Sequence, residues 1–78
     1  MKELVEVIAK SLVDNPDEVV VSEKEDAKSI VVELRVAPSD MGKVIGKEGK
    51  VAKAIRTLMK SVAGKERKKV SIEFVEEN

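Results

Sequence analysis

The chain has 78 residues and equal numbers of basic and acidic side chains, 15 of each, so its formal net charge is zero. This length predicts a single domain over residues 1–78. Histidine and cysteine are absent, which excludes imidazole acid–base catalysis, thiolate nucleophiles, disulfides and the usual zinc sites. No apolar stretch approaches the ~20 residues that cross a membrane, so we expect a cytoplasmic protein with no metal or cofactor.

The first half of the chain predicts one helix and two strands. Residues 2–14 have helical periodicity that ends at Asn15-Pro16, and their predicted buried side is formed by Leu4, Val5, Ile8, Ala9 and Leu12. A β-type run at 19–21 precedes a polar tract over 22–29. Residues 30–36 then alternate apolar and polar side chains, as in a half-buried strand. The short link between the runs favours an antiparallel hairpin.

The second half predicts two helices and a last strand. Pro38-Ser39-Asp40 indicates a helix start with Ser39 or Asp40 as its cap, followed by a short helix over 41–45. A longer helix over 49–63 ends at Gly64, which is typical of the C′ position. Its predicted apolar half is formed by Val51, Ala52, Ala54, Ile55, Leu58, Met59 and Val62. Residues 70–75 alternate again and predict a strand, with Phe74, the one aromatic residue, facing inward.

The element order is therefore α-β-β-α-α-β, which predicts an α+β fold. The first two strands form an antiparallel pair. The last two are joined by a two-helix crossover, which favours parallel pairing. We expect a three-stranded mixed sheet with three helices on one face.

The zero net charge conceals a segregation along the chain. Residues 1–40 hold five basic and ten acidic residues, whereas residues 41–69 hold ten basic and two acidic ones. A basic block centred on a helix–glycine–helix turn favours a phosphate-binding surface. The alternative for Lys53, Arg56 and Lys60 is an ordinary solvated helix face.

Two glycines, Gly46 and Gly49, bracket two residues between the predicted helices. Glycine permits a positive φ and lets a phosphate approach the backbone closely, and the following helix start offers free N–H groups and a favourable dipole. A Walker A loop is excluded because the spacing is wrong and Lys47 is followed by Glu48. A tight turn that binds no ligand is the alternative.

The segment Gly42-Lys43-Val44-Ile45-Gly46-Lys47-Glu48-Gly49-Lys50 resembles the VIGxxG signature of KH domains, and the helix order resembles their type II arrangement. A free-standing domain of this length is similar to the KhpA family of small bacterial RNA-binding proteins. The resemblance implies single-stranded RNA binding, RNA-chaperone or post-transcriptional regulatory activity, a KhpB-like KH partner, self-association, and a role in cell shape and envelope growth.

The KH resemblance also implies a site in which the GxxG turn clamps the backbone of about four nucleotides. The transferred clamp is Gly46, Lys47, Glu48 and Gly49, and the expected neighbouring charges are Lys43, Lys50, Lys53 and Arg56. The candidates for the apolar groove, or for the core beneath it, are Val44, Ile45, Val51, Ala52 and Ile55. Ala52 stands where many KH domains have a larger aliphatic side chain, and the acidic Glu48 offsets its basic neighbour. We therefore expect modest affinity.

Two other functions are weighed against RNA binding. A KH fold that serves as a protein-interaction module is the first, with Val7, Val13 and Val31 as contact candidates at the edges of the predicted core faces. An enzyme is the second, and it is rejected because the acidic clusters at 14–18 and 23–26 have neither EF-hand spacing nor an apolar pocket implied around them. Changing Lys47 to Asp, or both loop glycines to Asp, is expected to weaken RNA binding and leave the fold intact.

Overall fold

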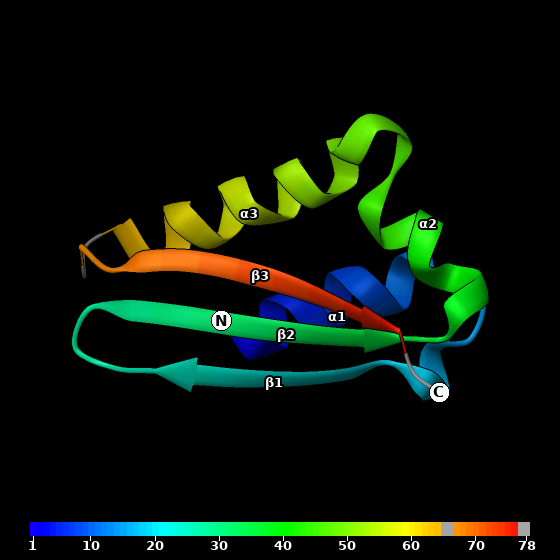
Figure 1. Ribbon diagram of the computed structural model, residues 1–78, viewed down its shortest axis with the longest axis horizontal. Coiled ribbons are helices and arrows are strands. Elements are labelled where there is room, and N and C mark those ends of the chain that lie inside the picture. The colour runs from blue at the N-terminus through cyan, green and yellow to red at the C-terminus, as the bar shows by residue number, and fades with distance from the viewer. Residues whose placement is uncertain (65–66, 77–78) are drawn as a thin grey trace.

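The computed structural model describes residues 1–64 and 67–76 (Figure 1). Its elements follow the predicted order α-β-β-α-α-β: α1 Lys2–Leu12, β1 Val20–Glu25, β2 Ser29–Val36, α2 Met41–Ile45, α3 Lys50–Ala63 and β3 Lys69–Glu76. Short 3₁₀ turns occupy Pro16–Glu18, Pro38–Asp40 and Lys47–Gly49. None of the described helices is long and apolar enough to span a membrane.

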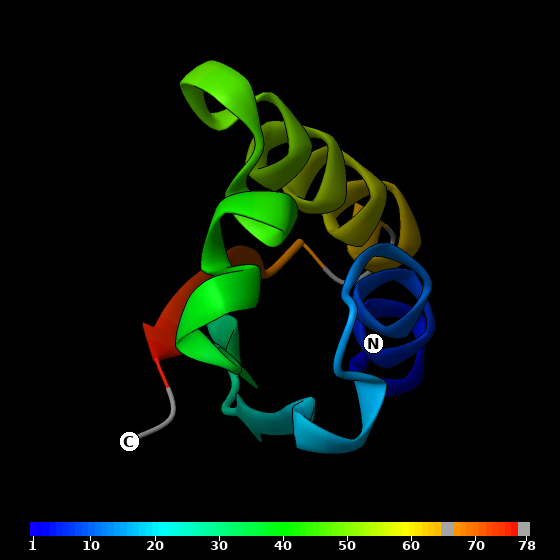
Figure 2. The ribbon, with the colours of Figure 1, turned by 90° about the vertical axis from the view of Figure 1, so that its right-hand side faces the viewer.

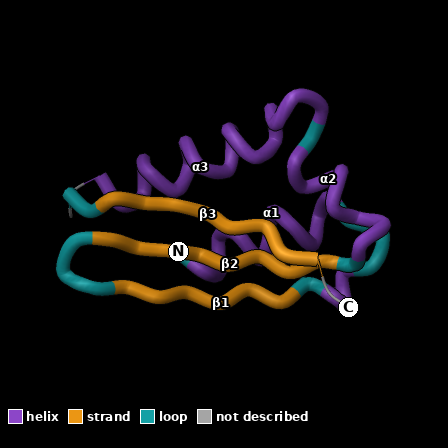
Figure 3. Tube along the Cα trace, viewed as in Figure 1, coloured by secondary structure: helices purple, strands orange, loops and turns teal. Residues whose placement is uncertain are grey.

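The three strands form one mixed sheet in the order β1-β2-β3 (Figure 3). Strands β1 and β2 are antiparallel, with Val21 opposite Leu34. Strands β2 and β3 are parallel, with Leu34 opposite Phe74. Because α2 and α3 connect the two parallel strands, the predicted crossover and sheet topology are confirmed.

The core lies between the sheet and the helices, which cover one face (Figure 2). Alternate residues of β2 are buried, as the period-2 pattern predicted: Ile30, Val32, Leu34 and Val36. Val5 and Ala9 of α1, Val44 of α2, and Ile55 and Met59 of α3 pack against them. Phe74 is half-buried at the margin of this core. The type II KH architecture with three helices on one face is confirmed.

The β1–β2 hairpin is tighter than predicted. Strand β1 runs to Glu25, so much of the polar tract expected to link the strands is itself a strand. The sequence of β1 is mostly polar because β1 is an edge strand that buries only Val21. The reversal is short because the Asp26 carboxylate accepts the backbone N–H groups of Lys28 and Ser29 at 2.7 and 2.8 Å, which is an Asx turn.

Helix ends differ from the sequence prediction by one or two residues. Helix α1 stops at Leu12 rather than at residue 14, since Val13 is already extended. Helix α3 begins at Lys50, after Gly49 in the left-handed region. Gly64 keeps a right-handed helical backbone, with φ −56°. It is therefore not in the left-handed conformation that is usual for a C′ glycine.

The predicted apolar half of α3 is wider than the face that it buries. Ile55, Met59 and Ala63 are buried, but Leu58 is 48% and Val62 61% exposed, and Ala54 is also exposed. Leu12, expected in the core, is 39% exposed. The flank of α3 that carries Leu58 and Val62 therefore remains in solvent.

Candidate nucleic-acid interface

The glycine turn joins α2 to α3 at the end of the molecule where the two helices meet (Figure 1). The Gly46 N–H donates to the Gly42 carbonyl at 2.8 Å, and the Gly49 N–H donates to the Gly46 carbonyl at 3.1 Å. Three of the four turn residues have positive φ: Gly46 78°, Glu48 58° and Gly49 73°. This backbone carries the Lys47-Glu48 tip away from the core, and both side chains are exposed.

Gly46 is required by packing as well as by its backbone angles. Its φ of 78° and ψ of 170° lie in a region that essentially only glycine adopts. A Cβ at this position would lie 2.4 Å from Val51 Cγ2 and 2.8 Å from the Val51 backbone nitrogen. The expectation that the double glycine change leaves the fold intact is therefore wrong for Gly46, since any side chain there overlaps the first turn of α3.

Gly49 has a different role, because a Cβ there would meet no atom within 4 Å. It occupies the left-handed region at φ 73°, ψ 16° and directly precedes α3, which no side chain caps. The Lys50 N–H already donates to the Lys47 carbonyl. The open space at Gly49 leaves room for an anionic group near the remaining N–H groups of the first turn of α3, for which no side chain competes.

Four of the predicted RNA contacts are exposed cations around this turn. Lys47 lies in the turn, Lys50 begins α3, and Lys53 and Arg56 follow within two helical turns. None of these four forms an ion pair with any residue that the structure describes. The acidic Glu48 lies at the same tip, so its negative charge offsets part of the positive charge of the turn.

Lys43, the fifth cation of the predicted site, is paired with acidic residues. Its ammonium pairs with the Asp14 carboxylate after α1 and lies 3.3 Å from Asp40 Oδ1. The hydrogen bond to Asp14, followed by that to Asp40, raises the pKa of Lys43 above its usual value. This ammonium ties α2 to the α1–β1 link, whereas the other cations of the predicted site point to solvent.

Asp40 has a structural role beside the glycine turn that the sequence did not indicate. The sequence offers Ser39 or Asp40 as the cap of the short helix, and Asp40 does occupy the N-cap position of α2, but its side chain forms no cap hydrogen bond. Instead the buried carboxylate accepts the backbone N–H groups of Asp14 and Asn15 at 3.1 and 3.0 Å, and the Asn15 Nδ2 at 3.2 Å. These partners lie about 25 residues away along the chain, so no local pattern indicates them. Asp40 fixes the helix that presents the glycine turn.

The Asp40 contacts predict a loss of stability in acid. Burial raises the pKa of Asp40, but the hydrogen bonds from Asp14 and Asn15 outweigh it, so the folded-state pKa is lowered. A carboxylate with a lowered pKa stabilises the fold above its unfolded value, about 3.9, and that stability is lost as pH falls through the folded pKa. Thermal melts between neutral pH and pH ~2 should show this fall for the wild type and a smaller one for Asp40→Asn.

Asp40→Asn should also lower the Tm at neutral pH, on the order of 10 °C, because an amide cannot accept all of these N–H donors. Asp17→Asn removes an exposed carboxylate from the same link and serves as the control. Wild-type acid sensitivity in Asp40→Asn would contradict the account.

The apolar groove candidates divide into two groups. Val44 and Ile55 are fully buried, at 0% and 1% exposure, and belong to the core. Ile45, Val51 and Ala52 are half-buried beside the turn, where a base could contact them. The short side chain of Ala52 leaves this surface shallow.

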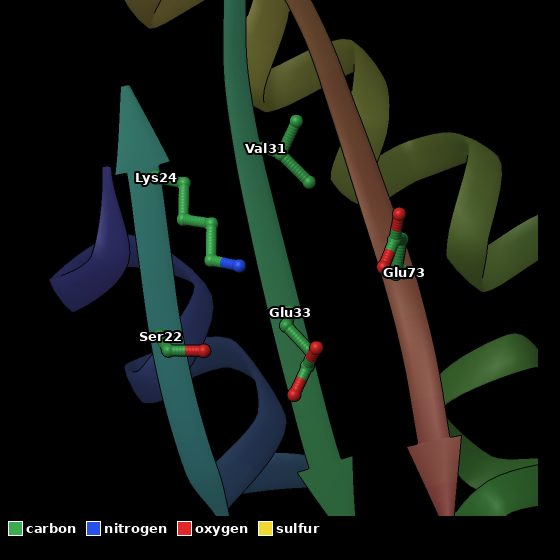
Figure 4. A pocket seen from close by; sticks show the side chains of 5 residues that line it. All are labelled: Ser22, Lys24, Val31, Glu33 and Glu73. Carbon is green, nitrogen blue, oxygen red and sulfur yellow. The ribbon is translucent and has the colours of Figure 1, made fainter. Parts of the chain in front are cut away.

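The open face of the sheet is unsuited to a phosphate strand. It has a depression of about 260 Å³ lined by Ser22, Lys24, Val31, Glu33 and Glu73 (Figure 4). Glu33 and Glu73 lie directly opposite each other across β2 and β3, so two carboxylates stand side by side in its lining. A polyanion is favoured on the helical side, around the glycine turn.

The α-β-β-α-α-β order, the mixed sheet and a GxxG turn between two helices define a type II KH domain. The family model described as the KH domain of KhpA/KhpB matches residues 2–74. The chain belongs to this KhpA/KhpB KH-domain family.

Curated relatives that match over nearly their full length are named RNA-binding protein KhpA. The chain is 63% identical to the RNA-binding protein KhpA of Clostridium acetobutylicum, over 96% of this chain and 100% of the relative. It is 61% identical to KhpA of Clostridium perfringens with the same coverage. KhpA of Aquifex aeolicus is 49% identical over 97% of this chain and 96% of the relative.

Among solved structures, the fold is similar to part of Era. Aquifex aeolicus Era bound to GDP·AlF4⁻ matches with a TM-score of 0.61 and 23% identity, over 96% of this chain and 29% of Era. Era in complex with a segment of 16S ribosomal RNA matches with a TM-score of 0.59 and 23% identity, over 97% of this chain and 30% of Era. At this identity the likeness concerns the fold alone.

Proposed function

We propose that this protein binds single-stranded RNA without catalysing a reaction, clamping about four nucleotides at the turn Gly46–Gly49. The observation that carries the proposal is the combination of an α3 start without a side-chain cap, open space at Gly49, and exposed cations beside it that form no ion pair with the described residues. The names of the KhpA relatives as RNA-binding proteins support it. RNA-chaperone or regulatory activity, a KhpB-like partner, and a role in cell shape and envelope growth are the cellular context that the family resemblance implies.

The site should bind weakly and with little base preference. Base stacking on aromatic side chains contributes much of the affinity of many single-strand binders, but Phe74 is the chain's one aromatic residue and packs against the core. Affinity must come chiefly from phosphate contacts, and a cytoplasmic RNA chaperone that releases its targets is compatible with such binding.

Binding through phosphate contacts predicts an RNA affinity that falls as the salt concentration rises. Three or four neutralised phosphates give a slope of log K against log salt of roughly −2 to −3, at about 0.7 per contact on a single strand. Fluorescence anisotropy with a labelled oligoribonucleotide of about four nucleotides, at several salt concentrations, measures the slope. An affinity that does not change with salt would contradict phosphate clamping.

The exposed flank of α3 favours a second candidate function, a protein-interaction face. Leu58 and Val62 lie one turn apart on the opposite flank from Arg56, with the buried line of Ile55 and Met59 between. Of the earlier candidates, Val7 is 68% exposed, whereas Val13 and Val31 are half-buried. A homodimer through this flank would join two weak RNA sites and raise avidity.

Mass measurement in solution tests the homodimer. The wild type is expected to sediment as a dimer, and Leu58→Glu with Val62→Glu as a monomer with an unchanged circular dichroism spectrum. Thr57→Glu with Ser61→Glu adds the same charge at exposed positions elsewhere on α3 and should leave the mass unchanged. A monomeric wild type would contradict the dimer and leave the RNA site as the function of the single chain.

A further inference from the structure

Helix α3 carries an uncompensated row of positive charge that continues past the clamp. Its sequence contains four basic residues and no acidic one. Lys53, Arg56 and Lys60 are spaced three and four residues apart, so they share one flank, and like charges at this spacing destabilise a helix. Ion pairing occurs elsewhere, as in Lys10–Glu6 and Lys68–Glu25. Among the described residues no acid pairs with this row.

Three further cations lie beyond the far end of α3, and we call them the distal cluster: Lys28, Arg67 and Lys69. All three are exposed. The Lys69 N–H donates to the Lys28 carbonyl at 2.9 Å, which places the hairpin turn beside the start of β3. The hairpin turn, the last turn of α3 and the start of β3 lie at the same end of the molecule (Figure 1).

The described acids near the distal cluster, Glu25 and Asp26, offset its charge only in part. The Asp26 carboxylate is held within the hairpin by the N–H groups of Lys28 and Ser29. Glu25 pairs with Lys68. Within the described part of the chain, no carboxylate forms an ion pair with any member of the cluster.

The row and the distal cluster together reach well past the glycine turn. Helix α3 has 14 residues, so the clamp at its start and the cluster at its end are separated by ~20 Å at 1.5 Å per residue. Cations near a helix C-terminus also stabilise the helix dipole. That effect falls off within the last turn, and it accounts for neither Lys28 in the hairpin nor Lys69 in β3.

We propose that the distal cluster is a second phosphate-binding site for the same RNA strand, which runs from the clamp along Lys53, Arg56 and Lys60. This inference rests on the proposed function, because it takes the clamp as the first point of contact. It implies a binding footprint longer than the four nucleotides that the clamp alone accommodates.

The test compares two lengths of unstructured oligoribonucleotide, about four and about ten nucleotides. The distal variant combines Lys28→Gln, Arg67→Gln and Lys69→Gln. The matched control combines Lys2→Gln, Lys10→Gln and Arg35→Gln, which removes the same charge from exposed residues away from α3. Affinity and salt slope are measured for each protein with each oligonucleotide, and melting curves establish that both variants fold.

The wild type and both variants are expected to bind the short oligonucleotide equally. For the long one, the distal variant should lose about tenfold in affinity, and its salt slope should be less steep by about 2, the contribution of three single-strand phosphate contacts. The control should retain wild-type values. A distal variant that binds the long oligonucleotide like the wild type, or a control that loses as much, would overturn the inference. Failure of the wild type to bind either length would instead overturn the clamp itself.

Discussion

Replacing Gly46 by alanine is expected to lower the free energy of unfolding by about 3 kcal/mol, since the backbone conformation alone costs ~1–3 kcal/mol and overpacking adds to it. The added Cβ would meet the Val51 side chain and, more seriously, the Val51 backbone nitrogen at 2.8 Å. Side chains can rotate away, but this nitrogen belongs to the first turn of α3. Urea denaturation measures the effect.

Two comparisons isolate the cause of the Gly46 effect. Gly49→Ala should cost only about 1–2 kcal/mol, the penalty of a left-handed residue, because a Cβ there meets open space. Adding Val51→Ala to Gly46→Ala should not restore stability, since the backbone overlap remains. Equal losses at the two glycines would show that backbone angles alone matter and that the close approach of the helices does not.

Lys47→Asp is expected to weaken binding of a short oligoribonucleotide by about tenfold and to reduce the salt slope by about 1. Lys47 is exposed at the tip of the turn, so the fold should be unaffected, in contrast to a Gly46 change. Anisotropy titration measures the affinity and circular dichroism the fold.

The neighbouring acid supplies the reciprocal variant. Glu48→Lys removes the one carboxylate of the turn and should tighten binding, with a steeper salt slope. Lys10→Asp, on α1, changes the net charge equally at a distant exposed position and should leave affinity unchanged. If Lys47→Asp bound RNA as well as the wild type, the turn would not be the site.

The order of elements was predictable because it depends on local patterns. The alternation of Ile30, Val32 and Leu34 identifies β2 from period 2 alone, and all three are buried. The predicted strand at 19–21 is shorter than β1 because an edge strand buries too few side chains to show an alternation of apolar and polar residues beyond Val21. The length of β1 is set by its pairing with β2, and the sequence of β1 alone gives no information about that pairing.

The site was predictable where it depends on backbone chemistry and not where it depends on distant partners. The positive φ of Gly46 and Gly49 agrees with the reason for expecting glycine there. The pairing of Lys43 with Asp14 and the burial of Asp40 join segments 25–29 residues apart, so a list of nearby charges could not separate Lys43 from Lys47. Likewise, helical periodicity indicated the apolar side of α3 but not that Leu58 and Val62 lie uncovered.

The most direct test of the clamp is a nuclear magnetic resonance titration of the ¹⁵N-labelled protein with a short unstructured oligoribonucleotide. The account predicts the largest amide shift changes from Gly46 to Ala52, with smaller changes at Lys53 and Arg56. Saturable changes elsewhere, with the amides of the turn unmoved, would contradict it.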